Sequence, residues 1–343
     1  MARRIIIIGL ALLALTAASC STPNREAKPG GNKTPSGAIT VYSGREKDLV
    51  APLYERFTAA TGITVNARYG DTAELAAQIL EEGSGSPADV FFAQDAGGLG
   101  AVSARGLFEP LEEAITNKVE SRFRASDRSW VGVSGRARVA VYNTETLKRE
   151  DLPTSILGFT DPKWKGKIGW APTNGSFQAF VTGLRILKGD DAARAWLRGL
   201  KANDAQVYPK NTPIVEAVNA GEIQVGFVNH YYVLEMMKDN PAIKAANYFF
   251  SGGDPGSLVN VAGVGIVKTS HNEAAARRFV EYLLETEAQE FFATETFEYP
   301  LVAGIKADPR LPALTALEPP AIDLSQLKSL EATLTMLKDE NIL

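Results

Sequence analysis

Between residues 38 and 92, short apolar runs alternate with segments whose apolar residues recur at helical spacing. The apolar runs predict buried strands over residues 38–42, 63–68 and 88–92. Helices are expected between them over 46–61 and 72–82, with Gly62 and Gly83 at their stop positions. A strand–helix–strand–helix–strand order predicts parallel strands joined by right-handed crossovers, and therefore an α/β fold.

A second α/β set follows an apolar run at 138–142. It comprises strands 167–170 and 223–228 with helices 177–187 and 190–202. A later strand at 259–267 leads into a helix at 272–285. We expect two lobes, residues 38–137 plus 260–310 and residues 138–259 plus 311–343, with chain crossings near 136–142 and 257–261. Two such lobes would enclose a hinged cleft suited to reversible capture. Ligands of parallel sheets bind beyond the carboxyl ends of the strands, so residues 42–46 and 93–95 are expected near any site.

The N-terminal residues have the pattern of an export signal. Arg3 and Arg4 precede an apolar run, and small residues lead to Cys20, the only cysteine. This pattern predicts a signal peptide over 1–19, whose apolar run is too short to span a bilayer. Cys20 after Ala-Ser resembles the lipobox of bacterial lipoproteins, although Ala17 stands where Leu is more usual; the alternative is an ordinary signal with an incidental cysteine. Residues 20–37 are polar and rich in Pro, Gly, Ser and Thr, which predicts a flexible tether.

Charge and composition exclude several classes of function. Loss of residues 1–19 removes two of 36 basic residues and moves the formal net charge from −4 to −6, which argues against a general nucleic-acid or membrane-surface binder. Without a second cysteine the chain has neither an internal disulfide nor a zinc–thiolate site. Two histidines, His230 and His271, and no GxSxG or Walker motif make an enzyme an unfavoured interpretation.

The strongest local candidate for chemistry is a tyrosine pair, Tyr231 and Tyr232, between an apolar strand and a helix-like stretch over 233–238. Adjacent side chains in a strand point to opposite faces, but at a strand-to-helix junction they can converge. Phenolate is a hard anionic oxygen donor that suits Fe(III), and a bound metal lowers the pKa of its ligands. Tyrosine pairs are also common in ordinary packing, so the pair alone leaves both interpretations open.

Five segments together resemble the ferric-iron-binding proteins of bacterial ABC importers. They are TVYSGR at 40–45, SPADVFFAQDAG at 86–97, GRARVAVYN at 135–143, DPKWKGKIGWAPTNGSF at 161–177 and FVNHYY at 227–232. The likeness runs from about residue 39 to 300 and implies a two-lobed periplasmic-binding-protein type II fold. It also implies an ABC permease with a separate ATPase as partner, and we expect a monomer.

The resemblance implies iron ligands at Tyr231 and Tyr232, with a third tyrosine at Tyr142; the alternative for Tyr142 is packing between the lobes. Relatives often carry a histidine, sometimes followed by tyrosine, where this chain has Glu46 and Lys47. Others carry glutamate where this chain has Gln94. Glu46 can either donate a carboxylate oxygen to iron or be an exposed acid at a helix N-terminus.

The resemblance also implies a synergistic anion, carbonate or phosphate, beside the metal. The matching positions are Asn174, Gly175, Ser176, Asn211 and Asn229, and backbone N–H groups at a helix N-terminus favour anions. Arg45 and Arg136 can add positive charge, or can instead form salt bridges or pack at the hinge. His230 is expected to point away from the phenols.

Three other functions stay open on the sequence alone. A receptor of the same fold can bind an organic anion such as a phosphonate through residues 174–176. An acid–base hydrolase can use Glu46 and Asp95 in the cleft. A lipoprotein that acts only as a scaffold would bind no ligand in the cleft.

Overall fold

The computed structural model describes residues 37–343, except for the side chains of 325 and 328. The predicted signal peptide, the lipidated Cys20 and almost all of the predicted tether lie outside the described residues. Within residues 37–343, no helix is long and apolar enough to cross a membrane.

The described strands form one 11-stranded mixed sheet with the central order β2-β1-β3-β10-β5-β8-β6-β7, while β4 pairs with β10, and β9 and β11 pair with β5. The strands are β1 (Gly37–Ser43), β2 (Ile63–Tyr69), β3 (Val90–Ala93), β4 (Phe108–Glu109), β5 (Val131–Asn143), β6 (Ile168–Trp170), β7 (Gln206–Val207), β8 (Val225–Asn229), β9 (Ala245–Tyr248), β10 (Val259–Val267) and β11 (Tyr299–Pro300). The parallel pairs β1–β2, β1–β3 and β6–β8 confirm the predicted α/β class.

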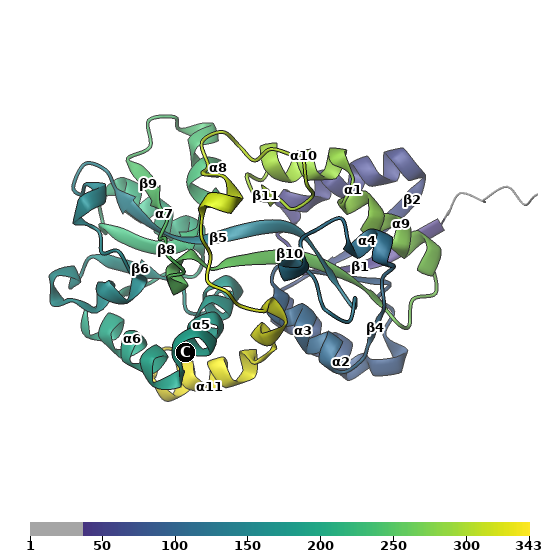
Figure 1. Cartoon of the computed structure of the whole chain (residues 1–343), viewed down its shortest axis with the longest axis horizontal. Coiled ribbons are helices and arrows are strands. Elements are labelled where there is room, and N and C mark those ends of the chain that lie inside the picture. The colour runs from purple at the N-terminus through teal and green to yellow at the C-terminus, as the bar shows by residue number, and fades with distance from the viewer. Residues whose placement is uncertain (1–36) are drawn as a thin grey trace, which may run out of the picture. The chain divides into compact units, whose positions relative to one another are not determined.

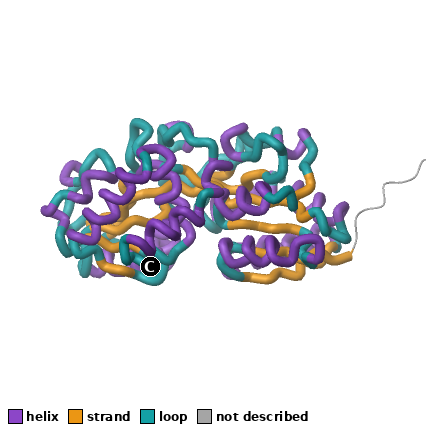
Figure 2. Tube along the Cα trace, turned by 90° about the horizontal axis from the view of Figure 1, so that it is seen from below, coloured by secondary structure: helices purple, strands orange, loops and turns teal. Residues whose placement is uncertain are grey.

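Helices lie on both faces of the strands (Figure 2). They are α1 (Lys47–Thr61), α2 (Thr72–Glu82), α3 (Ala96–Ala104), α4 (Glu113–Thr116), α5 (Gly175–Lys188), α6 (Asp190–Ala202), α7 (Asn211–Ala220), α8 (Tyr231–Asp239), α9 (Glu273–Leu283), α10 (Thr286–Thr294) and α11 (Leu330–Asp339). The predicted helices correspond to α1, α2, α5, α6 and α9. Gly62 ends α1 in the left-handed conformation at φ 73°, as its stop position predicted, because glycine has no Cβ to clash there.

Strand β5 belongs to two sections of the sheet (Figure 1). Its first half pairs with β10 and β11, and its second half pairs with β8 and β9. We call β2, β1, β3, β4, β10 and β11 the β1 section, and β8, β6, β7 and β9 the β6 section. The two sections meet near Ala137, where β5 leaves β10 and begins to pair with β8.

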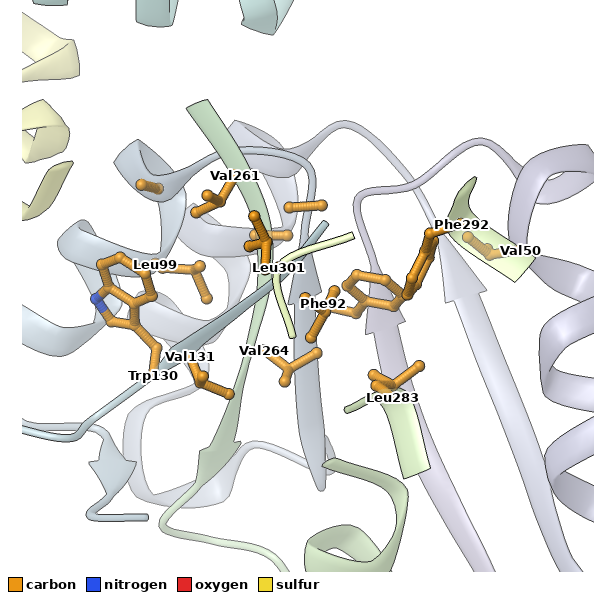
Figure 3. Packing of buried hydrophobic residues seen from close by; sticks show 14 of the residues in the cluster. Val50, Phe92, Leu99, Trp130, Val131, Val261, Val264, Leu283, Phe292 and Leu301 are labelled. Carbon is orange, nitrogen blue, oxygen red and sulfur yellow. The ribbon is translucent and has the colours of Figure 1, made fainter. Parts of the chain in front are cut away.

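Each section has its own aromatic and aliphatic packing. In the β1 section, Leu99, Val261 and Leu301 lie close to β10 and are almost fully buried (Figure 3). In the β6 section, Trp164, Trp170, Trp196 and Phe177 belong to a second buried cluster. These cores hold the strand ends that carry the polar side chains described next.

Candidate functional site

A polar cleft of about 580 Å³ opens at the carboxyl ends of β1 and β3. Gly44, Arg45, Glu46, Gln94 and Asp95 line it from the β1 section, as expected for parallel strands. Tyr42 does not, because it is buried and its hydroxyl hydrogen-bonds to Glu82. The opposite wall comprises Thr173, Asn174, Gly175, Gln178 and Lys210.

The tyrosine pair lies at the start of α8, directly after β8. Strand β8 ends at Asn229, and both tyrosines belong to the first turn of the helix rather than to the loop before it. Successive helical residues are about 100° apart, so neighbouring side chains can converge as alternating strand residues cannot. The two rings do so, with centroids 4.3 Å apart and planes inclined by 34°.

Burial raises the pKa of these phenols, and nearby polar and charged groups partly oppose that shift. Tyr231 is 1 % exposed, and burial raises its pKa well above the usual value, although the charges of Arg136 and Arg45 oppose the shift. Burial also raises the pKa of Tyr232, against hydrogen bonds with Tyr231 and Asn211. Both phenols are therefore protonated at neutral pH, and any cation bound as a phenolate complex must displace their protons.

Arg45 connects the cleft wall to the tyrosine pair. Its Nη2 donates to Glu298 Oε2 at 2.7 Å, and both side chains are almost fully buried. The hydroxyls of Ser134 and Thr296 donate to the same carboxylate oxygen. The guanidinium is thus fixed by an ion pair with Glu298, while its charge also acts on both phenols.

His230 anchors the start of α8. Its Nδ1 accepts a hydrogen bond from Ala137 N at 3.1 Å, so the proton belongs on Nε2, which donates to Phe297 O at 2.8 Å. Burial lowers the pKa of His230 to about 4, which keeps the imidazole neutral. Both ring nitrogens are engaged with backbone atoms. The expectation that His230 points away from the phenols is wrong, because its ring packs edge-on against that of Tyr231, with centroids 5.8 Å apart.

Four of the expected anion-binding residues come together at the N-terminus of α5. Asn174 caps the helix, because its Oδ1 accepts from Ser176 N at 3.0 Å. Asn211 Nδ2 donates to Asn174 Oδ1 at 3.2 Å and to Ser176 Oγ at 3.3 Å. Gly175 is the first residue of the helix and lines the cleft beside Asn174.

Asn229 and Arg136 lie deeper, at the junction of the two sheet sections. They line a small cavity of about 10 Å³ together with Arg138 and Asn260. Arg138 was missed on the sequence, although its i,i+2 spacing from Arg136 in a strand places both on one face. Burial lowers the pKa of Arg138 to about 9, against the raising effect of Tyr232 and Tyr231.

Glu46 lies at the mouth of the cleft. Its side chain is 60 % exposed, and Lys210 Nζ donates to its Oε1 at 3.4 Å from the other wall. The expectation of an exposed acid just before a helix agrees with its place as the residue preceding α1, but no side-chain cap accompanies it.

The structure does not bring Tyr142 to the tyrosine pair. Tyr142 is opposite Val225, the first residue of β8, whereas the pair follows Asn229, the last residue, which is opposite Arg138. Four strand residues separate these positions, about 13 Å along β5. Tyr142 instead packs, partly buried, against the aromatic cluster of the β6 section.

Two carboxylates near the pair were also missed on the sequence. Glu298 follows α10 and is fully buried, and Glu235 lies one helical turn after the tyrosines on α8. Burial, followed by the charge of Glu298, raises the pKa of Glu235 to about 7. The spacing from Tyr231 to Glu235 is i,i+4, the one signal that would have placed Glu235 on the same helix face. In residues 37–343, no three or more His, Cys, Asp or Glu side chains form a group that could hold a metal ion.

Comparisons with known proteins agree with this geometry. Residues 85–323 match the family model described as "Bacterial extracellular solute-binding protein". The "Major ferric iron-binding protein" of Neisseria meningitidis serogroup B is 36 % identical over 304 residues, covering 88 % of this chain and 92 % of that protein. The "Fe(3+)-binding periplasmic protein" of Serratia marcescens is 36 % identical over 296 residues, with 85 % and 87 % covered.

Solved structures of ferric-iron-binding proteins are similar to this chain as well. Iron-bound HitA from Pseudomonas aeruginosa superposes with a TM-score of 0.85 at 33 % identity, covering 88 % of this chain and 99 % of that one. This likeness confirms the predicted two-lobed periplasmic-binding-protein fold. A more distant relative is a putative 2-aminoethylphosphonate-binding periplasmic protein of Salmonella typhimurium, 23 % identical over 262 residues.

Proposed function

This chain belongs to the family of bacterial extracellular solute-binding proteins, and on that premise we propose that it captures ferric iron through the phenolates of Tyr231 and Tyr232. The observation that carries the proposal is the convergence of two buried phenols, with 4.3 Å between ring centroids, next to Arg45 of the polar cleft. Its relatives in Neisseria and Serratia, similar over most of their length, are ferric-iron-binding proteins by name.

The chemistry of the pair suits a trivalent ion better than a divalent one. Protonated phenols are weak ligands, and burial makes their ionisation costly without a strong cation. Fe(III) is hard and highly charged, so it offsets that cost by replacing the protons with two strong metal–oxygen bonds. The two phenolates leave one positive charge of the ion for other ligands.

A synergistic anion, carbonate or phosphate, would supply the remaining oxygen donors. Asn174, Gly175 and Ser176 present the first turn of α5 next to the cleft, and Asn211 joins this loop to Tyr232. Arg45 and Arg136 add positive charge beside the phenols. Asn229 belongs to the same region. We leave Tyr142 out of the ligand set, because it lies at the far end of β8.

The family is one of solute-binding proteins rather than enzymes, and the site does not favour hydrolysis. Glu46 is ion-paired with Lys210, and Asp95 accepts hydrogen bonds from Gly97 N and Gly98 N as the cap of α3. A phosphonate receptor has the support of distant relatives, at 23 % identity. It would use the Asn174 loop without needing the phenols.

We extend the proposal to the transport cycle. The β1 and β6 sections, with their helices, would form the two lobes, and β5 and β10 would supply the hinge near Ala137. The closed protein would dock on an ABC permease driven by a separate ATPase, outside the cytoplasm and tethered through Cys20. Opening the cleft, reprotonating the phenols or reducing the iron would release the metal.

Titration of the purified protein with ferric citrate, followed by visible absorption, tests the proposal. Wild-type protein should develop a broad phenolate-to-iron charge-transfer band, and Tyr231→Phe should lose the band and at least about 100-fold in iron affinity. Tyr142→Phe is the matched control, a tyrosine outside the pair on the neighbouring strand β5, and should behave as wild type.

A colourless wild-type protein that takes up no metal would refute the iron proposal. A band lost in Tyr142→Phe but kept in Tyr231→Phe would move the ligand set to the other end of β8. Stabilisation by phosphonates, in a protein that fails to bind iron, would support the organic-anion receptor instead.

A further inference from the structure

The C-terminal residues pack against both sections of the molecule. The 3₁₀ turn Leu324–Lys328 lies mainly against α3, which covers β3 and β10, and α11 lies against α5, which covers β8 (Figure 1). Their buried leucines accordingly belong to different cores. Leu324 and Leu327 join the cluster that contains Leu99 of α3, whereas Leu337 joins the cluster of the β6 section. The C-terminal segment therefore connects the two sections at a place separate from the β5 and β10 crossings.

Polar bonds fix α11 to the helices of the β6 section. Thr333 is fully buried, and its hydroxyl oxygen lies 2.7 Å from that of Thr182 on α5. Arg185 of α5 donates to Thr333 Oγ1 at 2.9 Å. Just after α11, Glu340 Oε2 accepts a hydrogen bond from Nε of Arg198 on α6 at 2.7 Å. We infer from these bonds that α11 moves together with α5 and α6.

Leu327 makes the contact with α3. Its side chain is almost fully buried, and its carbonyl oxygen lies 3.1 Å from the position that a Cβ on Gly97 of α3 would occupy. A side chain at residue 97 would push the two segments apart, which explains why a glycine stands inside this helix. On the other side, Leu327 Cδ2 lies 3.8 Å from the corresponding Cβ position of Gly183 on α5. Leu327 thus lies between a helix of each section.

The same two helices begin at opposite walls of the cleft. Asp95, which caps α3, and Gly175, the first residue of α5, both line the cleft. Asp95 Oδ2 lies 3.8 Å from the position that a Cβ on Gly175 would occupy, so the two walls are close together at this point. Because α11 moves with α5, widening the cleft pulls Leu327 away from Gly97.

We propose that the C-terminal segment, residues 324–339, stabilises the closed cleft, because Leu327 packs against α3 only while the two walls are close together. Apolar packing is not directional, so this contact can break and form again, whereas the hydrogen bonds and ion pair of α11 keep the segment on the β6 section. The inference rests on the proposed opening of the two sections about Ala137, but not on the identity of the solute.

The contact should act on the protein with or without a solute. Opening exposes the Leu327 side chain to water and so costs the hydrophobic free energy of that side chain. The equilibrium between open and closed protein is therefore shifted toward the closed form. A solute that bridges the two walls then has less to contribute to closure, and it should dissociate more slowly than it would without the contact.

Distances between two spin labels in iron-free full-length protein test the proposal. Cys20→Ser removes the only native thiol, while Ala59→Cys on α1 and Ala220→Cys on α7 provide an exposed labelling site in each section. Double electron–electron resonance then measures the fraction of molecules at the distance of the structure. Leu327→Ala in this labelled background should lower the ratio of closed to open molecules at least about tenfold.

Leu337→Ala is the matched control, because Leu337 is fully buried in the same C-terminal segment but packs within the β6 section. It should lower the melting temperature as Leu327→Ala does, and leave the distance distribution unchanged. Gly97→Ala tests the contact from α3, since its methyl group would crowd Leu327 O, and should also lower the closed fraction. Distributions that coincide with and without Leu327→Ala, or an equal change in Leu337→Ala, would overturn the proposal.

Iron release separates this proposal from the proposed function. In protein loaded with ferric iron, Leu327→Ala should release the metal to an excess of chelator at least about tenfold faster than wild type, with the charge-transfer band unchanged in position. A protein that binds no iron, but loses its closed form in Leu327→Ala, would refute only the proposed function. An iron band in a protein whose distances Leu327→Ala leaves unchanged would refute only the role of Leu327.

Discussion

The tyrosine pair, which adjoins the cleft through Arg45, is held by buried backbone contacts, whereas Glu46 on the cleft wall is held by one exposed ion pair. Tyr231 follows a strand of the sheet, and the preceding His230 is hydrogen-bonded to backbone atoms of β5 and of the segment after α10. Glu46 and Lys210 are 60 % and 66 % exposed and joined at 3.4 Å. Exposed pairs contribute only about 0 to 1 kcal/mol, so the tyrosine pair and Glu46 differ in how firmly they can hold a ligand.

This difference bears on where specificity arises. Groups that must discriminate Fe(III) from other ions need fixed geometry and a low dielectric, and the buried tyrosine pair provides both. The exposed ion pair between Glu46 and Lys210 can break and form at little cost in free energy. It therefore suits opening and closing better than recognition.

The largest effect expected from the comparison is the pH dependence of iron affinity. Burial raises the pKa of both phenols, so both protons are bound at neutral pH in the iron-free protein. Iron releases two protons on binding, and its affinity should rise about 100-fold for each unit of increasing pH. Competition against a chelator of known proton dependence, between pH 6 and 8, measures this slope.

Tyr232→Phe sharpens the measurement. With one phenol left, the affinity should change about tenfold per pH unit rather than 100-fold. A wild-type slope near 1,000-fold per unit would show that a third proton-releasing group joins the site, and Glu235→Gln would then test whether that group is Glu235, whose pKa is raised to about 7, rather than Tyr142. A slope near tenfold would show that only one phenol of the pair binds the metal.

The second largest expected effect is the pH dependence of folding stability that arises from His230, which anchors the tyrosine pair. Burial lowers the pKa of His230 to about 4, from about 6.5 in the unfolded chain. The unfolded state therefore binds more protons than the folded state at acidic pH, and stability should fall as the pH drops from about 6.5 to 4. The shift corresponds to about 3 kcal/mol in full.

Urea unfolding of iron-free His230→Gln against wild type isolates this contribution. Glutamine can accept from Ala137 N and donate to Phe297 O, but it does not titrate. The variant should lose less stability than wild type between pH 7 and 4. His271→Gln, at an exposed histidine, serves as control and should retain the wild-type pH profile. Equal acid sensitivity in all three proteins would assign the effect to other groups.

The sequence was informative where local pattern decides structure. The α/β class followed from apolar runs and helical spacing, and the convergence of Tyr231 and Tyr232 followed from their place at a strand-to-helix junction. Helices α3 and α7 were missed. In α3 three glycines stand among its nine residues, and α7 carries an early proline, so propensity argues against helices that tertiary packing nevertheless stabilises.

The sequence pattern could not predict which residues far apart in the chain lie close together in the fold. Tyr142 ends an apolar run as Tyr231 follows one, but only the antiparallel register of β5 and β8 shows that they lie at opposite ends of β8. Arg138 and Glu298 were overlooked because each acquires its importance from residues far away in the chain. Glu298, for example, is 253 positions from Arg45, its ion-pair partner. No local spacing encodes such a contact.

The smallest expected effect decides the role of Glu46. As a metal ligand, Glu46 would lose at least about tenfold in iron affinity on change to Gln, with a shift of the charge-transfer band. As the exposed partner of Lys210, it should change the affinity no more than about fivefold and leave the band in place. The structure favours the second outcome, because the carboxylate is paired at the cleft mouth.

Substitution of Lys210, the ion-pair partner of Glu46, distinguishes the two roles of Glu46. If Glu46 acts through the ion pair, Lys210→Gln should have the same small effect, and Glu46→Gln with Lys210→Gln should add nothing further. If Glu46 binds iron, Lys210→Gln should instead strengthen binding, because it frees the carboxylate and removes a positive charge that repels the ion. The sign of the change in iron affinity caused by Lys210→Gln therefore shows whether Glu46 is an ion-pair partner or a metal ligand, even when both effects are small.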